Sequence, residues 1–207
     1  MKYKTYYHNH ADSIIKSEAL FASAFSEITD VIESMNDQKL IETHINVQKK
    51  RKGAKSLSEA INTILKDELE AKSWEKEAKI FKEPPYDSTN KKNWRLDFAK
   101  DPISIEVAFN HGEAVAHNLL KPVLASQLNH VKKAIQTQMA VIITATEELK
   151  DKGNFDGAIG TYDKYIEYLK PYAIYMAIPV IIIGLKAPDS FYICLLYTSD
   201  AADEEDS

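Results

Sequence analysis

Two continuous apolar runs set the strongest limit on how this chain can fold. "MAVIITAT" (139–146) and "IPVIIIGL" (178–185) are rich in β-branched residues and contain no charged side chain. Such runs are typical of strands buried on both faces, as in a parallel sheet covered by helices. We therefore expect an α/β fold with these two segments at the centre of the sheet.

A hairpin of two shorter strands is predicted upstream of these runs. Apolar and polar residues alternate over 94–99 and again over 103–109, and the Asp101-Pro102 dipeptide between them favours a turn. Asp97 and Glu106 both fall at polar positions of this alternation. Once the strands pair as a hairpin, the two carboxylates lie on the same face of the sheet.

Helical spacing of apolar residues predicts the layers around the sheet. The segment 41–55 begins instead as a possible strand and ends as a basic loop. The Ser-x-x-Glu pattern of "SLSE", from Ser56, is that of a capping box. The expected helices are 12–35, Ser56 to about Trp74, 113–136 with Pro122 inside it, and 155–171. This order indicates a mixed central β-sheet flanked by helices on both faces.

Composition limits the class of protein further. The longest apolar stretch, "AIPVIIIGL", is too short to span a bilayer, and the segment "MKYKTYYHNH" lacks the apolar core of a secretory signal. We therefore expect a cytoplasmic protein with no membrane partner. A single cysteine excludes a disulfide framework and a cysteine-based zinc cluster.

The C-terminal segment 194–207, "CLLYTSDAADEEDS", differs from the rest in composition. It holds five acidic residues and no basic one, and it resembles the translation of a sequencing-library adapter. We interpret it as non-native, with a disordered acidic tail as the alternative. Residues 1–193 are then expected to form one domain. Within them, 26 of the chain's 31 acidic residues match all 26 basic ones, so the net charge does not exclude an anionic partner.

Asp97 and Glu106 suit a divalent cation. Two carboxylates on adjacent strands repel each other unless a positive charge lies between them. Mg²⁺ prefers oxygen ligands, and the Val107 carbonyl on the same strand offers another. Such an ion activates water and stabilises hydrolysis of a phosphodiester. From spacing alone, however, a solvated sheet face with two unrelated acids is the simpler interpretation.

A family resemblance favours the metal site. "LDFAKDPISIEVAF" (96–109) resembles the active-site hairpin of PD-(D/E)xK nucleases, in particular the BglII-like type II restriction endonucleases. That branch shows a D-F-x-x-D/R-x-x-x-x-E-V-Q-F pattern with the same nine-residue step. "YYHNHADSII" (6–15) and "LKDELEAKSW" (65–74) also resemble segments of that family, in the same order. The similarity thus extends over about residues 6–186.

The resemblance implies a restriction-endonuclease-like core and a Mg²⁺-dependent nuclease domain over 1–193. Asp97 and Glu106 would be the metal carboxylates, with the Val107 carbonyl as a further ligand. A homodimer would cut both strands of a short palindromic site in double-stranded DNA, for which the family tends to use GATC. The host would also carry a companion DNA methyltransferase.

The chain departs from the family pattern at Ala108. The family has Lys, Glu or Gln there, whereas alanine can neither orient a water nor hold a proton. Glu113, His117 and Lys121 lie at i, i+4 and i+8 of the helix that follows, which puts them on one helix face. We expect Lys121 to supply the missing charge, and Glu113 or His117 to align the nucleophile or join the metal shell. The alternative is a solvated helix stripe.

Contact with DNA is expected from two basic clusters and one loop. The clusters would bind backbone phosphates. By the resemblance, Asn110 and His111 would approach base edges, since Asn can contact adenine and His can donate to guanine; the alternative is a polar turn. The first basic cluster consists of Lys49, Lys50, Arg51, Lys52 and Lys55, and the second of Lys91, Lys92 and Arg95 with Trp94 among them.

Three other functions fit the sequence. The chain could be a PD-(D/E)xK nuclease of repair or junction cleavage without a specific site. Ala108 also fits a DNA-binding relative that has lost catalysis. Finally, the hairpin match could arise by chance in an unrelated α/β domain, which would bind neither metal nor DNA.

Overall fold

A single six-stranded sheet organises the protein. The structure is a computed structural model that describes residues 1–51, 54–84, 94–127 and 132–193. The strand order is β1-β6-β5-β4-β3-β2. β4, β5 and β6 run parallel, and the other pairs are antiparallel, which confirms the expected mixed sheet. The strands are β1 Tyr3–His8, β2 Glu75–Lys79, β3 Arg95–Lys100, β4 Ile103–Val107, β5 Met139–Ala145 and β6 Val180–Leu185.

The two apolar runs form the centre of this sheet, as predicted. Every residue of β5 and of β6 is buried, because helices cover both faces. The two edge strands were not predicted. β2 has the sequence "EKEAK", in which three of five residues are exposed, and β1 is mostly half-buried. An edge strand with so little buried surface carries no apolar signature.

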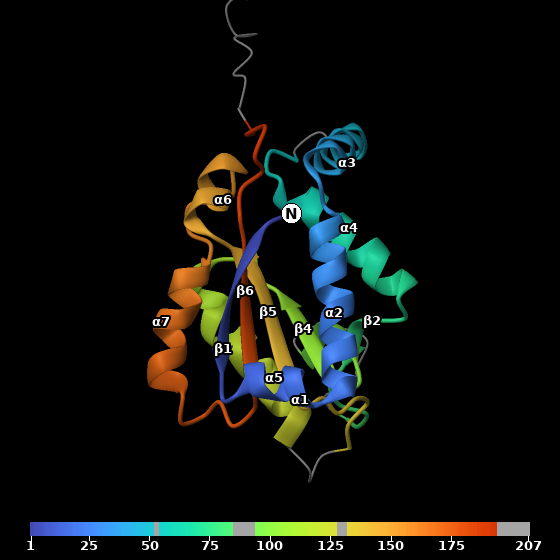
Figure 1. Cartoon of the computed structure of the whole chain (residues 1–207), viewed down its shortest axis with the longest axis vertical. Helices are drawn as coiled ribbons and strands as arrows, with labels where there is room; N and C mark the ends of the chain where they lie inside the picture. The colour runs from blue at the N-terminus through green and yellow to red at the C-terminus, as the bar shows by residue number, and fades with distance from the viewer. Residues whose placement is uncertain (52–53, 85–93, 128–131, 194–207) are drawn as a thin grey trace, which may run out of the picture.

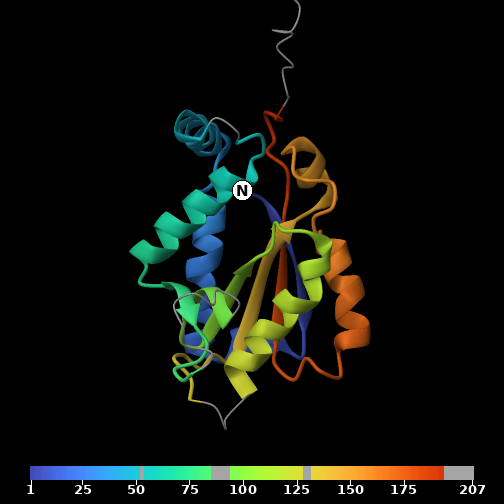
Figure 2. The ribbon, with the colours of Figure 1, turned by 180° about the vertical axis from the view of Figure 1, so that it is seen from behind.

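Helices cover the sheet in two layers, which confirms the expected architecture. Figure 1 shows α2 in front of the sheet, and Figure 2, from behind, shows α5 across the opposite face. Apolar residues of α2 and α4 share a core cluster with Ile103 and Ile105 of β4, whereas those of α5 and α7 share another with Ala108. The helices are α1 Ala11–Ser17, α2 Ala19–Ser34, α3 Asp37–Lys50, α4 Ser58–Ala71, α5 Val115–Gln127, α6 Glu147–Lys152 and α7 Tyr162–Tyr172.

Several predicted helices have different bounds. The helix expected over 12–35 is two helices, because Glu18 between them adopts an extended backbone. The helix expected over 113–136 consists of a 3-10 turn (Gly112–Ala114) and α5, and residues 132–136 are not helical. Only the second part of 155–171 is helical, in α7. The predicted tail, 194–207, lies outside the described residues.

Two predictions before the hairpin were wrong. The possible strand after residue 41 is part of helix α3, which Asn36 caps by accepting a hydrogen bond from the Lys39 backbone nitrogen at 2.9 Å. The capping box expected at Ser56 does not form either. Helix α4 begins at Ser58, its N-cap residue is Leu57, and no side chain caps it.

A hydrogen-bonded cluster fastens the helix layer to the hairpin. Glu27 of α2 accepts hydrogen bonds from Trp74 Nε1 and Lys100 Nζ, each at 2.8 Å. Lys100 Nζ also donates to the Lys72 carbonyl at 2.9 Å, at the end of α4. The C-terminal end of β3 is therefore held against both helices, which fixes where the hairpin lies.

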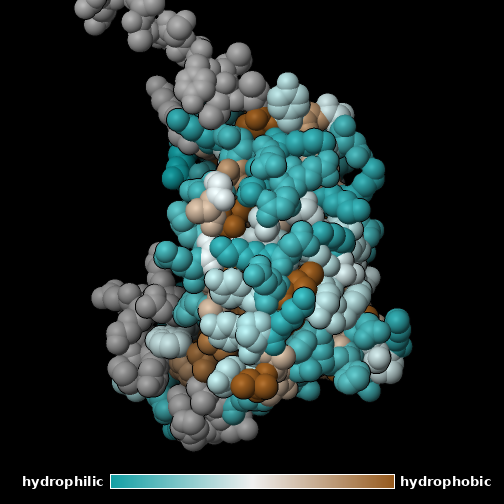
Figure 3. Space-filling view, turned by 90° about the vertical axis from the view of Figure 1, so that its left-hand side faces the viewer, coloured by the Kyte–Doolittle hydropathy of each residue, from teal (hydrophilic) through white to brown (hydrophobic). Residues whose placement is uncertain are grey.

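The side of the molecule that carries α6 and α7 is mostly hydrophilic, with small separate apolar spots (Figure 3). This is the surface expected of a solvent-facing helix layer. Within the described residues, no helix is both long and apolar enough to cross a membrane.

Candidate active site

The hairpin brings the two predicted carboxylates together. Its register pairs Phe98 with Ile105 and Ala99 with Ser104, and one further step places Asp97 across from Glu106. Residues directly opposite each other on paired strands point to the same face. The strands are also joined through a side chain, since Asp97 Oδ2 accepts a hydrogen bond from the Val107 backbone nitrogen at 2.7 Å.

Glu106 lies deep in the protein, with only 1% of its surface exposed. Burial raises its pKa well above the usual range, the neighbouring Asp97 carboxylate raises it further, and Lys121 opposes both. The carboxylate oxygen Oε1 has no hydrogen-bond partner in the described structure. A buried oxygen in this state is costly unless a positive group satisfies it.

Asp97 is the more accessible member of the pair. Burial raises its pKa and the Glu77 carboxylate adds to the rise, while the Lys121 ammonium and the Val107 N–H lower it. The pKa values of both carboxyls are therefore raised, in each case chiefly by burial. This is the electrostatic state that a bound cation would relieve.

Lys121 reaches this pair from helix α5. Its Nζ forms an ion pair with Glu106 Oε2 and donates to the Arg95 carbonyl at 3.1 Å. The residue is only 9% exposed. A lysine from the opposing helix thus lies beside the strand position where the family pattern has its third polar residue.

Ala108 explains why the helix can come so close. Its side chain is fully buried in a cluster with Val115 and Leu119 of α5. Its backbone is fixed on both sides, because its N–H donates to the Ile143 carbonyl and its own carbonyl accepts from Thr144 Oγ1. A long side chain at 108 would need the space that α5 occupies, so Ala108 and Lys121 belong to one packing arrangement.

The other residues predicted on this helix face are in different surroundings. Glu113 lies in the 3-10 turn and His117 in the first turns of α5, and both are exposed, whereas Lys121 is buried. Their roles in aligning a nucleophile or in the metal shell stay predictions.

Asn110 and His111 are exposed in the loop after β4, where base contacts were predicted. Asn110 Oδ1 accepts a hydrogen bond from Asn118 Nδ2 at 3.2 Å, and the same amide donates to the Tyr165 hydroxyl at 2.8 Å. His111 Nε2 lies 3.7 Å from Asp156 Oδ2. The loop is thus supported by buried polar groups that the sequence did not point to.

The first basic cluster lies at the end of α3 and in the segment that follows. Lys49, Lys50 and Lys55 are exposed. Arg51 is exposed as well but forms an ion pair with Glu59 at 2.8 Å. Three predicted members of the basic clusters, Lys52, Lys91 and Lys92, lie outside the described residues.

A cleft of about 340 Å³ opens beside Asp97. Helix α4 and strand β2 form its walls, and Phe98 and Val107 complete its lining. Two lysines in these walls, Lys66 and Lys76, escaped sequence analysis. One is an isolated lysine in an amphipathic helix and the other belongs to an unpredicted strand, so no pattern distinguished them from ordinary surface residues.

The donor set fits a hard divalent cation. Among the described residues, no three His, Cys, Asp or Glu side chains lie close enough to bind one metal ion, so the pair Asp97 and Glu106 would need other oxygen ligands. The Val107 carbonyl and water are suitable for Mg²⁺. The unpartnered Glu106 Oε1 and the raised pKa values of both carboxyls agree with a missing positive charge.

Comparisons with known proteins agree with this hairpin. Among solved structures, the crystal structure of restriction endonuclease BglII complexed with a DNA 16-mer has a TM-score of 0.61 at 20% identity, covering 92% of this chain and 78% of that one. Free BglII has a TM-score of 0.51 at 18% identity, covering 92% and 82%. This likeness shows the fold. No curated protein matches the sequence.

The sequence itself carries the family assignment. A family model described as restriction endonuclease BglII/BglIII matches residues 3–185, from the first strand of the sheet to the last. The match includes the hairpin with Asp97 and Glu106 and the helix with Lys121. The chain belongs to the BglII/BglIII family of restriction endonucleases.

Proposed function

We propose that this protein is a Mg²⁺-dependent type II restriction endonuclease that hydrolyses double-stranded DNA at a short palindromic site. The observation that carries the proposal is the bond of the Asp97 carboxylate to the backbone nitrogen of Val107, next to Glu106, with the Lys121 ammonium paired to Glu106. Membership in a family of restriction endonucleases supplies the reaction class. Residues 1–193 would make up the nuclease domain.

In the proposed site, Asp97, Glu106 and the Val107 carbonyl would hold the metal ion. When bound, Mg²⁺ would supply an activated water and neutralise charge on the phosphate. Asp97 would orient its carboxylate through the Val107 N–H bond, and the burial of Glu106 would exclude bulk water from the inner side of the pair.

Lys121 would take the role that the family gives to the residue at position 108. Its ammonium is held between Glu106 and the Arg95 carbonyl, so it offers a fixed positive charge beside the carboxylates. Glu113 and His117 remain candidates for aligning the nucleophile from the exposed start of the same helix. The alternative that Ala108 marks a DNA-binding relative without catalysis is therefore less well supported by the geometry.

DNA binding would use the basic cluster at the end of α3 and the loop after β4. Lys49, Lys50 and Lys55 are exposed and available to phosphates, while Arg51 would have to give up its pair with Glu59. Asn110 would present its amide to base edges from the loop after β4. His111, the next residue, would donate to guanine. The target site could contain GATC.

Cutting both strands of a palindrome requires two active sites related by a two-fold axis, so we propose a homodimer. A companion DNA methyltransferase would protect the host genome from this activity. The enzyme would act in the cytoplasm, where host DNA and incoming DNA are both accessible.

Cleavage mapping tests this function. The protein is incubated with Mg²⁺ and a library of randomised duplexes, and with a plasmid of mixed sequence. Discrete fragments ending at one short palindrome are expected, and Asp97→Asn and Glu106→Gln are expected to produce none while remaining folded. A smear would indicate a nonspecific nuclease instead, DNA retention without strand breaks would indicate a binding relative, and neither binding nor cutting would remove the nuclease assignment.

A further inference from the structure

The two carboxylates of the pair differ in their access to the cleft described above. On the inner side, Glu106 is 1% exposed and Lys121, which belongs to α5, is 9% exposed. On the outer side, Asp97 lines the cleft of about 340 Å³ between α4 and β2. Glu106 does not line this cleft, so a phosphodiester that approaches the pair meets Asp97 first.

Two lysines line this cleft from different elements. Lys66 lies on α4 and Lys76 on β2, and both contribute to its lining together with Asn62, Thr63 and the acidic residue Glu77. Asn62 precedes Lys66 by one helical turn, so both side chains lie on the same helix face. Within the ranges that the structure describes, neither ammonium forms an ion pair, whereas Lys39 and Lys100 nearby are paired with Glu68 and Glu27.

We propose that this cleft receives the sugar-phosphate backbone of the strand to be cut, with Lys66 and Lys76 each neutralising one phosphate next to the scissile one. The inference rests on the proposed nuclease function, because the DNA substrate brings a phosphate on each side of the scissile one, and each of these anions can be neutralised by a lysine of the cleft. Phosphate contacts of this kind fix the position of the duplex and carry no sequence information. Lys66 and Lys76 are therefore positioning residues.

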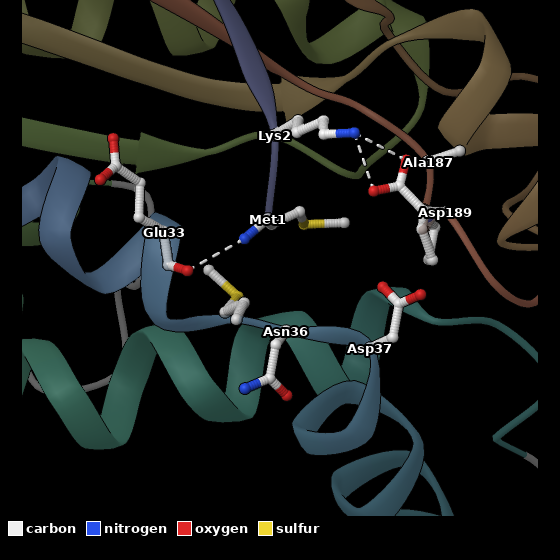
Figure 4. A pocket seen from close by; sticks show the side chains of 9 residues that line it. Met1, Lys2, Glu33, Asn36, Asp37, Ala187 and Asp189 are labelled. Carbon is white, nitrogen blue, oxygen red and sulfur yellow. Dashed lines mark hydrogen bonds and ion pairs between the residues drawn. The ribbon is translucent and has the colours of Figure 1, made fainter.

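A second hollow, beside the N-terminus, does not suit an anion. It has a volume of about 410 Å³, and its charged lining includes Glu33, Asp37 and Asp189 (Figure 4). Lys2, its one lysine, forms an ion pair with Asp189 at 2.8 Å. The ammonium groups of that hollow are thus already engaged, since Lys2 is paired with Asp189 and the Met1 N-terminus donates to the Ile32 and Glu33 carbonyls. Lys66 and Lys76 differ in this respect, because neither forms an ion pair within the described residues.

A phosphate scan tests the inference. Duplexes carrying the cleaved site are made with one uncharged methylphosphonate at each position around the scissile phosphate. Their affinities are measured with the full chain and Ca²⁺ in place of Mg²⁺, for wild type, Lys66→Met and Lys76→Met. Lys170→Met, exposed on α7 at the other face of the sheet, is the matched control. Lys66→Arg retains the charge and is expected to behave as wild type.

We expect wild type to lose about tenfold in affinity at two phosphate positions, and each methionine variant to be insensitive at one of them. The slope of log affinity against log salt should decrease by about 0.9 for each contact removed. If both variants keep the wild-type scan and salt slope while wild type still cuts, the cleft assignment is wrong and the nuclease function stands. If wild type neither cuts nor binds, the proposed function itself has failed.

Discussion

The Asp97 carboxylate accepts a hydrogen bond from the Val107 backbone nitrogen at 2.7 Å, and this bond ties the outer carboxylate to the strand that carries Glu106. The Asp97 side chain thus holds the two strands together and is also proposed to bind the metal ion. The two tasks can be separated, because an amide oxygen accepts the same hydrogen bond without carrying a charge.

Asp97→Asn is expected to abolish cleavage while the free energy of unfolding stays within about 1 kcal/mol of wild type. Asp97→Ala should abolish cleavage too, but it also leaves the Val107 N–H without its partner, at a cost of about 1–3 kcal/mol. Plasmid cleavage and urea unfolding on the same samples measure both effects. Residual nicking by the asparagine variant would show that the Asp97 charge is not needed for catalysis.

Lys121→Met is expected to lower the rate of cleavage about 10²-fold or more, because it removes the only described ammonium in contact with Glu106. If Lys121 had only a structural role, its loss would lower stability and thereby cleavage as well. A second measurement must therefore distinguish this from a role at the carboxylates. Without this ammonium, Mg²⁺ or Ca²⁺ should bind the DNA-free protein more tightly, since a competing positive charge has gone. Calorimetric titration of the metal measures this, and Lys170→Met is the control. Unchanged cleavage would remove Lys121 from the mechanism.

Ala108→Gln restores the residue type of the family and is nevertheless expected to be harmful. Ala108 is fully buried against Val115 and Leu119, so a longer side chain must displace α5. Overpacking of this kind costs about 1–3 kcal/mol, and it should also withdraw Lys121 from Glu106. The midpoint temperature of thermal unfolding and the rate of cleavage should both fall. A glutamine variant of full activity and stability would mean that the helix position is adjustable and that position 108 can still serve catalysis.

The sequence predicted what depends on local pattern. β5 and β6 were found because both faces of each strand are buried, and the hairpin because its two faces differ. α3 was misassigned because Ile41, Ile45 and other β-branched residues recur at every second position, as in a strand. In the structure Ile41 and Ile45 are exposed, and the helix buries Leu40 and His44 instead. Because the buried position 44 is a histidine, the spacing of apolar residues alone does not show the helical period of this segment.

The part of the candidate site that depends on local pattern was also predicted. Asp97 and Glu106 lie on one hairpin, so their proximity follows from register, and Lys121 was named from helical spacing on the next element. The packing of Ala108 against α5, and the cleft with Lys66 and Lys76, depend on where whole helices lie against the sheet. That placement is set by contacts such as Glu27 with Lys100 and Trp74, which no local pattern contains.

The raised pKa of Glu106 predicts how stability depends on pH in the metal-free protein. Burial and the Asp97 charge make the folded state hold the Glu106 proton more tightly than the unfolded chain, whose glutamates titrate near about 4.3. The folded state therefore binds more protons above that pH, and the free energy of unfolding falls as pH rises toward the raised pKa. Glu106→Gln has no proton to lose and should show a flatter profile. Urea unfolding with a chelator, from pH 4 upward, compares the two.

Adding Mg²⁺ should reverse this loss, because a metal ion that binds the ionised pair stabilises the folded state only. At a Mg²⁺ concentration about a hundred times its dissociation constant, the gain is about 2.7 kcal/mol. Wild type is expected to gain stability at neutral pH and to lose the gain when a chelator is added. Asp97→Asn and Glu106→Gln should gain little, since each lacks one of the two carboxylates proposed to hold the ion. The comparison needs no DNA and no turnover, so it tests the metal site apart from cleavage. Equal stabilisation of wild type and both variants would place the bound ion elsewhere on the protein and leave Asp97 and Glu106 without a metal-binding role.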